Sequence, residues 1–379
     1  MKLLVLSHAC VVPINQQFFA EIENQTDWEV TIIVPTKWKN DYGKVIKSER
    51  WDKFQGKIIN IPVLFSGSIP LHMYWAWFIP LLKQLKPDAI YVQHEPYALA
   101  TMQIYMANAL SVRKPITFLS WQNIFKSYPF LFRQIENFVD KQSFIAFPGS
   151  SSVENVLRQK GFRGDCQFLP YAADPSIYFP RADVSDLRAK WQIREDEVVV
   201  GYLGRIIEEK GFKTLLHALA LIVDLPWRFV IVGTGDYEDQ VDQIASQLGI
   251  KDRVLKLGFI PHNEAPRYLS AFDMLVLPSE TQANWKEQFG RVIIEAMACG
   301  SPVIGSDSGE IPYLIKKTGG GVIFPENNSE ELANRLRQLI ANKTLRQEFA
   351  EQGQKSVSTN YTNASITKRF IDVFSRFVT

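Results

Sequence analysis

Short runs of Val, Ile and Leu alternate along the chain with segments whose apolar residues recur every three or four positions. Continuous apolar runs are typical of parallel strands buried on both faces, and the longer periodicity is typical of the helices that cover them. In the first half, the pattern predicts strands at 3–7, 30–34, 58–63, 89–93, 116–120 and 144–147, with helices near 15–23, 72–85, 97–110, 130–141 and 151–160.

The second half repeats this alternation. It predicts strands at 198–203, 229–232, 254–256, 274–277, 303–305 and 321–324, with helices near 211–223, 237–248, 263–271, 290–299, 329–341 and 345–355. Strands that alternate with helices indicate an α/β fold with parallel sheets. Because 379 residues exceed the usual size of one hydrophobic core, we expect two doubly wound domains that face each other across a cleft.

The segment 170–180 holds Pro170, Pro175 and Pro180 without any periodicity, which is typical of a linker. We therefore expect a first domain at 1–170 and a second at 171–362. The remaining segment, 363–379, is amphipathic, and we expect a helix that packs back on the first domain. Ligands of such folds bind at the carboxyl ends of the strands.

Composition narrows the class of protein. The net charge of +2 argues against a dedicated nucleic-acid binder. Three cysteines without a Cys-x-x-Cys pair exclude a disulfide scaffold or zinc site and fit a reducing compartment. Residues 1–7 are too short an apolar run for a secretory signal, and no run approaches the ~20 apolar residues of a membrane-spanning helix. We expect a cytoplasmic protein.

The first half carries a basic excess and one conspicuous aromatic segment. Residues 1–170 hold 18 Lys and Arg against 13 Asp and Glu. The segment 71–82 contains Tyr74, Trp75, Trp77 and Phe78 and follows a lysine-rich stretch. It is either a peripheral contact with a membrane surface or lipid-linked acceptor, or a helix that covers its own sheet; both interpretations stay open.

Two cations follow the strand 198–203. Arg205 comes directly after Gly204, and Lys210 precedes a segment with helical periodicity. They therefore lie at the carboxyl end of a strand beside a helix N-terminus, where backbone amides also attract anions. A planar guanidinium and a compact ammonium together suit a diphosphate. Gly233 marks a second strand-to-helix turn, and Gly258-Phe259 offers backbone edges and a ring suited to a nucleobase.

Glu287 and Glu295 are the most informative acids. Glu295 lies within an apolar helical segment, where an unpaired charge would cost several kcal/mol, so a ligand hydroxyl is a plausible partner. Eight residues of helix would separate the two glutamates by about 12 Å, which is comparable to the span from a sugar through a diphosphate to a ribose.

Together these motifs, Gly204-Arg205…Lys210-Gly211, Gly233-Thr-Gly235, Leu257-Gly-Phe259 and Glu287-x7-Glu295 with Phe289-Gly290 inside it, resemble the large retaining glycosyltransferase family numbered four. The resemblance implies the GT-B fold of two Rossmann-like domains, with acceptor bound by the first and nucleotide-sugar by the second. It implies that Arg205 and Lys210 neutralise the donor diphosphate, that Glu287 contacts the donor sugar and that Glu295 holds the ribose. Phe289 and Gly290 would contact sugar and phosphate, and Gly204, Gly233, Gly258 and Phe259 would line the donor site.

The first domain departs from the family pattern. Its first loop, residues 7–13, lacks glycines, and no histidine follows the strand 116–120. Gln122 and Asn123 are the candidates for polar acceptor contacts there. His94, and less strongly His8, end strands and are either substrate contacts or structural. No Asp-x-Asp follows an apolar strand, so we expect catalysis without a metal or other cofactor.

The sequence therefore predicts a metal-independent hexosyltransferase-type enzyme that moves a sugar, with retention, from a UDP- or GDP-linked donor to a cell-surface polysaccharide or lipid-linked glycan. Two alternatives remain. A nucleotide-sugar 2-epimerase shares the architecture, but the Glu-x7-Glu spacing disfavours it. An inactive glycosyltransferase-like binding subunit is disfavoured by the intact cations and glutamates, while the missing loop glycines keep it open.

Overall fold

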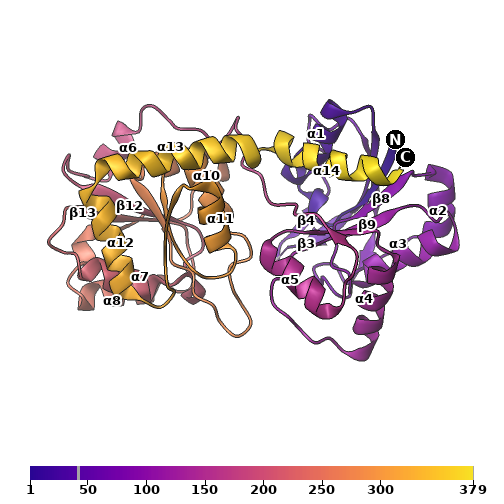
Figure 1. Ribbon diagram of the computed structural model, residues 1–379, viewed down its shortest axis with the longest axis horizontal. Coiled ribbons are helices and arrows are strands. Elements are labelled where there is room, and N and C mark those ends of the chain that lie inside the picture. Colours follow the sequence, from indigo (N-terminus) through magenta and orange to yellow (C-terminus); the bar gives the residue numbers. More distant parts are fainter. Residues whose placement is uncertain (41–42, 379) are drawn as a thin grey trace. The chain divides into compact units, whose positions relative to one another are not determined.

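The computed structural model describes residues 1–40 and 43–378, the last two of these as backbone only. The chain divides into two compact units, Met1–Pro170 with Asn363–Thr379 (unit 1) and Tyr171–Thr362 (unit 2). Each is an α/β unit with one main parallel sheet (Figure 1). This confirms the predicted α/β fold class; residue 379 of the expected C-terminal helix lies outside the described residues.

Unit 1 is built on a seven-stranded sheet of order β11-β10-β9-β8-β1-β2-β5, in which every neighbouring pair is parallel. Its strands are β1 Lys2–Leu6, β2 Glu29–Pro35, β5 Lys57–Ile61, β8 Ala89–Val92, β9 Ile116–Ser120, β10 Ile145–Pro148 and β11 Asp165–Cys166. Two small antiparallel pairs accompany it, β3 Lys37–Lys39 with β4 Val45–Lys47 and β6 Val63–Leu64 with β7 Met73–Tyr74.

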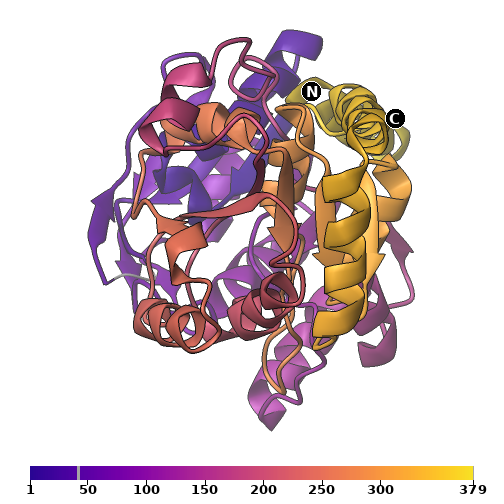
Figure 2. The same cartoon turned by 90° about the vertical axis from the view of Figure 1, so that its left-hand side faces the viewer.

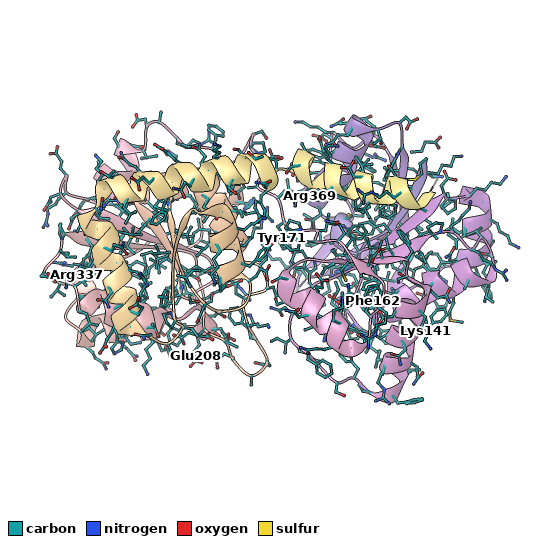
Figure 3. All side chains as sticks on the ribbon, viewed as in Figure 1. Lys141, Phe162, Tyr171, Glu208, Arg337 and Arg369 are labelled. Atoms are coloured by element: carbon teal, nitrogen blue, oxygen red, sulfur yellow. The ribbon has the colours of Figure 1, made fainter. Side chains whose placement is uncertain are left out.

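The helices of unit 1 are α1 Gln17–Gln25, α2 Phe78–Leu85, α3 Leu99–Leu110, α4 Phe130–Gln142, α5 Ser151–Lys160 and α14 Asn363–Val378, with short 3-10 helices at η1 Ala9–Val11 and η2 Pro13–Gln16. Helix α14 packs beside α1, and its Phe370 ring lies 5.0 Å from that of Tyr91 in β8. Phe162 lies inside the core of this unit (Figure 3).

Unit 2 has a six-stranded parallel sheet of order β14-β13-β12-β15-β16-β17. Its strands are β12 Val198–Leu203, β13 Trp227–Val232, β14 Val254–Lys256, β15 Met274–Leu277, β16 Val303–Ser306 and β17 Gly321–Phe324. The helices are α6 Ser185–Lys190, α7 Phe212–Ala220, α8 Glu238–Gln247, α9 Ala265–Ala271, α10 Arg291–Ala298, α11 Ile311–Thr318, α12 Ser329–Ala341 and α13 Lys343–Asn360, with 3-10 turns η3 Glu208–Lys210, η4 Lys251–Arg253 and η5 His262–Glu264. Figure 2 looks onto this unit and shows helices around its strands.

One expectation about elements needs correction, and two helices were missed. The segment 72–85 is not one helix, because Met73–Tyr74 pairs with Val63–Leu64 and the helix begins only at Phe78. Helices α6 and α11 were not predicted; α6 has only six residues, and α11 carries a proline in its first turn, where the missing N–H costs nothing. None of the described helices is long and apolar enough to span a membrane.

Candidate functional site

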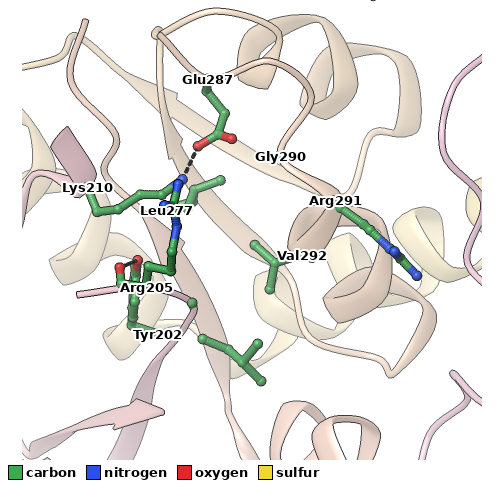
Figure 4. A pocket seen from close by; sticks show the side chains of 10 residues that line it. Tyr202, Arg205, Lys210, Leu277, Glu287, Gly290, Arg291 and Val292 are labelled. Carbon is green, nitrogen blue, oxygen red and sulfur yellow. Dashed lines mark hydrogen bonds and ion pairs between the residues drawn. The ribbon is translucent and has the colours of Figure 1, made fainter. Parts of the chain in front are cut away.

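A pocket of about 190 Å³ opens in unit 2 where β12 and β15 end and α10 begins (Figure 4). The carboxyl ends of parallel strands are the usual place for ligands in such sheets. The pocket brings together five predicted site residues, Gly204, Arg205, Lys210, Glu287 and Gly290. Tyr202, Leu203, Leu277, Arg291 and Val292 complete its lining.

The turn after β12 presents Arg205 to this pocket. The buried Tyr202 donates its hydroxyl hydrogen to the carbonyl oxygen of Arg205 at 2.6 Å, which fixes the backbone at that residue. Burial and the nearby charge of Glu287 raise the pKa of Tyr202 well above its usual value, so the phenol stays a donor. The Arg205 side chain is exposed, and no carboxylate of residues 1–40 or 43–376 forms an ion pair with it. Its charge is available to an anion.

Lys210 and Glu287 form an ion pair inside the pocket. The Nζ of Lys210 lies 2.5 Å from Oε2 of Glu287, and Ser279 donates its hydroxyl hydrogen to the same oxygen at 2.8 Å. The indole of Trp285 lies 5.0 Å from the ammonium, within reach of a cation–π interaction. Both charged side chains are nearly buried, with exposed fractions of 12% and 11%. The acid and the lysine are therefore held together at a fixed place.

Glycines allow the loops of this site to touch backbone to backbone. A Cβ on Gly211 would lie 1.9 Å from the carbonyl oxygen of Pro278, and one on Gly233 would lie 1.9 Å from that of Gly204. Gly211 also has a φ of +69°, which L-residues with side chains rarely adopt. The absence of a side chain at Gly211 thus lets the loop that carries Lys210 pack directly against the loop after β15.

Glu295 lies in the second turn of α10, where its side chain is buried. The Nε of Arg291 approaches its Oε1 to 2.8 Å, but the N–H is poorly aligned, and Oε1 has no hydrogen-bond partner within the described part of the chain. Glu295 does not line the 190 Å³ pocket. Since α10 begins at Arg291, Glu287 is not on the same helix, and the 12 Å estimate for a continuous helix does not apply.

The other predicted donor residues are not among those that line the pocket. Gly233 donates its backbone N–H to the carbonyl of Gly258 at 2.8 Å, which joins the ends of β13 and β14. Phe259 is 77% exposed. Phe289 is buried, with its ring 5.6 Å from that of Tyr171.

In unit 1, Gln122 and His94 each contact other polar side chains. Gln122 accepts a hydrogen bond from the Nζ of Lys160 at 2.8 Å, and this ammonium also pairs with Glu136 at 2.6 Å. Asn123 is buried. His94 is buried and stacked on His8, with ring centroids 4.8 Å apart. Their roles toward an acceptor stay predictions.

Sequence reasoning gave no role to three residues that shape the donor-side pocket, Ser279, Trp285 and Arg291. Arg291 precedes Glu295 by four positions, the spacing at which helical side chains meet, so that pair was available as a signal. It also gave no role to His72, whose partners are far away in the sequence.

Part of the chain is similar to known proteins. Residues 183–356 match the family model described as Glycosyl transferases group 1. The chain is 28% identical to an uncharacterized glycosyltransferase of Methanocaldococcus jannaschii, over 48% of the chain and 46% of that protein. It is 29% identical to the lipopolysaccharide core biosynthesis glycosyltransferase LpsE of Rhizobium meliloti, over 50% of the chain and 53% of that protein. The chain thus spans about half the length of the curated relatives it matches.

Solved structures match nearly the whole chain. Anabaena HepE in complex with UDP covers 99% of this chain and 100% of its own, with a TM-score of 0.76 and 20% identity. A glycosyltransferase from Rickettsia africae covers 100% and 98%, with a TM-score of 0.75 and 15% identity. The chain therefore has the GT-B fold, and its residues 183–356 are similar to group 1 glycosyl transferases.

Proposed function

We propose that this chain transfers a sugar from a nucleoside-diphosphate sugar to an acceptor hydroxyl, with retention of configuration. The observation that carries the proposal is the pocket in which Arg205 and the Lys210–Glu287 pair converge at the strand ends of the group 1 domain. Support also comes from relatives named as glycosyltransferases and from similarly folded structures that contain UDP or UDP-glucose.

In this mechanism, Arg205 and Lys210 bind the diphosphate and stabilise the negative charge that grows on it as it leaves. The bond between the sugar C1 and the diphosphate oxygen breaks, and its electrons stay on that oxygen. The acceptor oxygen bonds to C1 on the same face, and its proton passes to the leaving diphosphate. Two protein cations supply the charge stabilisation, so no metal is required for this step.

The two glutamates have different roles in this proposal. Glu287 accepts hydrogen bonds from donor-sugar hydroxyls; because Lys210 and Ser279 already share its Oε2, it positions the sugar and does not act as a nucleophile. Glu295 accepts from the ribose hydroxyls. Its Oε1 is ion-paired with Arg291 but accepts no hydrogen bond from the described residues, and a buried carboxylate oxygen gains from any donor that reaches it.

The donor is proposed to be a UDP- or GDP-linked hexose, and the acceptor a cell-surface polysaccharide or lipid-linked glycan. Relatives named for lipopolysaccharide core biosynthesis favour such acceptors. We place the enzyme in the cytoplasm, in peripheral contact with the membrane through unit 1, where Trp75 and Trp77 are 71% and 87% exposed.

The decisive experiment measures binding and transfer separately. Calorimetry of the protein with UDP, GDP and their sugars, in EDTA, should give saturable binding of one base. Arg205→Ala should weaken that binding, and Lys213→Ala, an exposed lysine on α7, should not. Transfer is then scored as sugar found on the acceptor by mass spectrometry. Well-folded protein that binds no nucleotide would overturn the proposal, and binding without transfer to any glycan would favour the inactive binding subunit. Interconversion of the free nucleotide-sugar without an acceptor would identify a 2-epimerase.

A further inference from the structure

Three of the five histidines of the chain converge in unit 1, far apart in sequence. His8 follows β1, His94 follows β8, and His72 precedes β7. Strands β1 and β8 are parallel neighbours, so their carboxyl ends bring His8 and His94 together. One ring nitrogen from each of the three side chains lies within 4.8 Å of the others. The three-histidine cluster lies outside the pocket of unit 2 and has no part in the proposed donor chemistry.

One ring nitrogen of His72 is hydrogen-bonded to the backbone, and the other has no hydrogen-bond partner within the described residues. Its Nδ1 lies 3.0 and 2.9 Å from the carbonyl oxygens of Ser68 and Ile69, so Nδ1 carries the proton and donates. Its Nε2 is then unprotonated and carries a lone pair. The side chain is 0% exposed, and Nε2 has no hydrogen-bond partner within the described residues. An imidazole whose N–H is held by a backbone carbonyl while its other nitrogen has no protein partner is the arrangement found in metal-bound histidines.

His8 and His94 contact each other directly. Their Nδ1 atoms face each other at 2.8 Å, and the Nε2 of His94 lies 3.4 Å from the hydroxyl of Tyr74. Burial lowers the pKa of His94 well below its usual value, with the charges of His72 and His8 acting in the same direction. Burial, and then His72, lowers the pKa of His8 to about 3. Burial thus favours the neutral form of the three rings, which is the form that binds metals.

We infer that His8, His72 and His94 form a binding site for a divalent transition metal such as zinc. Imidazole nitrogen suits Zn²⁺, Cu²⁺ and Ni²⁺ rather than Mg²⁺ or Ca²⁺. With Zn–N distances of about 2.0–2.1 Å in a tetrahedron, ligand nitrogens lie roughly 3.4 Å apart, so the His8–His94 pair opens by about half an ångström on binding.

The fourth position is left to water or to an oxygen of a bound molecule. Cys10 is two positions from His8, but its Sγ is directed to the carbonyl oxygen of Asn15 at 3.5 Å and to Gln93 Oε1 at 3.7 Å. Three protein ligands with an open fourth position are typical of catalytic rather than closed structural zinc sites. This site differs from the metal-free expectation for the chain, although the donor step proposed for unit 2 still needs no metal.

Cobalt and zinc titrations of the full chain, stripped of metal and free of any affinity tag, test this inference. One Co²⁺ per chain should bind with the visible absorption bands of four-coordinate cobalt, and one equivalent of Zn²⁺ should displace it and raise the melting temperature. His8→Gln, at the half-exposed edge of the cluster, and His72→Gln should each weaken binding at least about 100-fold, because even loss of an outer-shell partner costs about 10- to 100-fold.

The matched control is His217→Gln on α7, which should bind cobalt as the unaltered chain does. Circular dichroism shows whether each variant is folded, and if His72→Gln is not, His8→Gln decides the question. Absence of stoichiometric cobalt binding by the folded chain would overturn the inference. So would unchanged binding in a folded His8→Gln variant, or loss of binding in His217→Gln.

Discussion

Lys210 and Glu287, 77 positions apart, meet through a 2.5 Å contact between Nζ and Oε2. Lys210 ends the 3-10 turn after β12, and Glu287 lies in the loop before α10. Both side chains are nearly buried, so each depends on the other for charge compensation. When a ligand phosphate binds Lys210, Glu287 needs another hydrogen-bond donor in place of the ammonium. Hydroxyls of a bound sugar supply one. The ion pair therefore stabilises the empty site, and its two residues bind the two halves of the proposed donor, Lys210 the diphosphate and Glu287 the sugar.

Replacing one partner should destabilise the chain more than replacing both. Lys210→Met leaves the Glu287 carboxylate uncompensated and should lower the free energy of unfolding by roughly 2–4 kcal/mol. Adding Glu287→Gln should restore part of this loss, because a neutral amide still accepts from Ser279. Urea unfolding of the two single variants and the double variant measures the coupling, with Lys213→Met as the surface control. Strictly additive effects would show that the ion pair has no energetic role.

Glu295→Gln should weaken binding of the nucleoside diphosphate by roughly 10- to 100-fold, since a hydrogen bond to a charged group is worth about 1.5–3 kcal/mol. The isosteric amide keeps the volume inside α10, so folding should be retained. Arg291→Ala removes the cation beside the buried Glu295 carboxylate and should lower the free energy of unfolding by about 1–3 kcal/mol. Calorimetry with the preferred nucleotide measures the first effect and thermal unfolding the second. Equal affinity in Glu295→Gln and the unaltered chain would remove Glu295 from the ribose site.

The fold was predictable because its strands are continuous apolar runs, and burial on both faces of a parallel sheet leaves no other place for them. The place of Arg205 and Lys210 at the pocket was predictable for a related reason, because each is a cation next to the end of such a run or to a glycine turn, whereas Glu287 was singled out by the Glu-x7-Glu motif. The three-histidine cluster was not, because its members are contributed by separate loops and only the sheet order brings them together. The single helix expected at 72–85 was wrong because a two-residue antiparallel pair carries too little pattern to be seen.

Gly211 and Gly249 share a φ of +69° but differ in how closely other atoms approach them. Substitutions at the two positions therefore distinguish steric crowding from backbone strain. A Cβ on Gly249 meets nothing within 4 Å, whereas one on Gly211 would lie 1.9 Å from the carbonyl oxygen of Pro278. Gly249→Ala should therefore cost only the strain of the left-handed backbone, about 1–2 kcal/mol. Gly211→Ala should cost several kcal/mol more and weaken nucleotide binding, because the neighbouring Lys210 must move. Denaturant unfolding measures the stability of the two variants. Equal losses of unfolding free energy would show that the loop after β15 moves aside without cost.

The aromatic residues on the surface of unit 1 test the proposed membrane contact. Trp75 and Trp77 are 71% and 87% exposed, and indole rings favour the headgroup region of bilayers. The double change Trp75→Ser with Trp77→Ser should reduce binding to anionic phospholipid vesicles by on the order of tenfold. Phe130→Ser, which alters a residue of α4 that is 69% exposed, is the matched control. Vesicle flotation that is equal for all three proteins would exclude a contact through these tryptophans.

Asp140 on α4 should make stability fall as pH rises. Burial raises the pKa of its carboxyl from 3.8 to about 7, the charge of Glu136 acts in the same direction, and Lys160 opposes them. A raised native pKa favours the folded state while the group is protonated, and this advantage is lost between about pH 4 and pH 7. Asp140→Asn keeps the shape without the charge, so it should melt within a degree of the unaltered chain near pH 4.

At pH 8 the Asp140→Asn variant should be more stable than the unaltered chain by on the order of 1–3 kcal/mol. A tenfold change in the proton affinity of a group corresponds to about 1.4 kcal/mol, and the partial exposure of this side chain reduces the full effect. Melting curves of both proteins between pH 4 and pH 8 measure the difference. A gap that stays constant with pH would show that Asp140 does not titrate in this range.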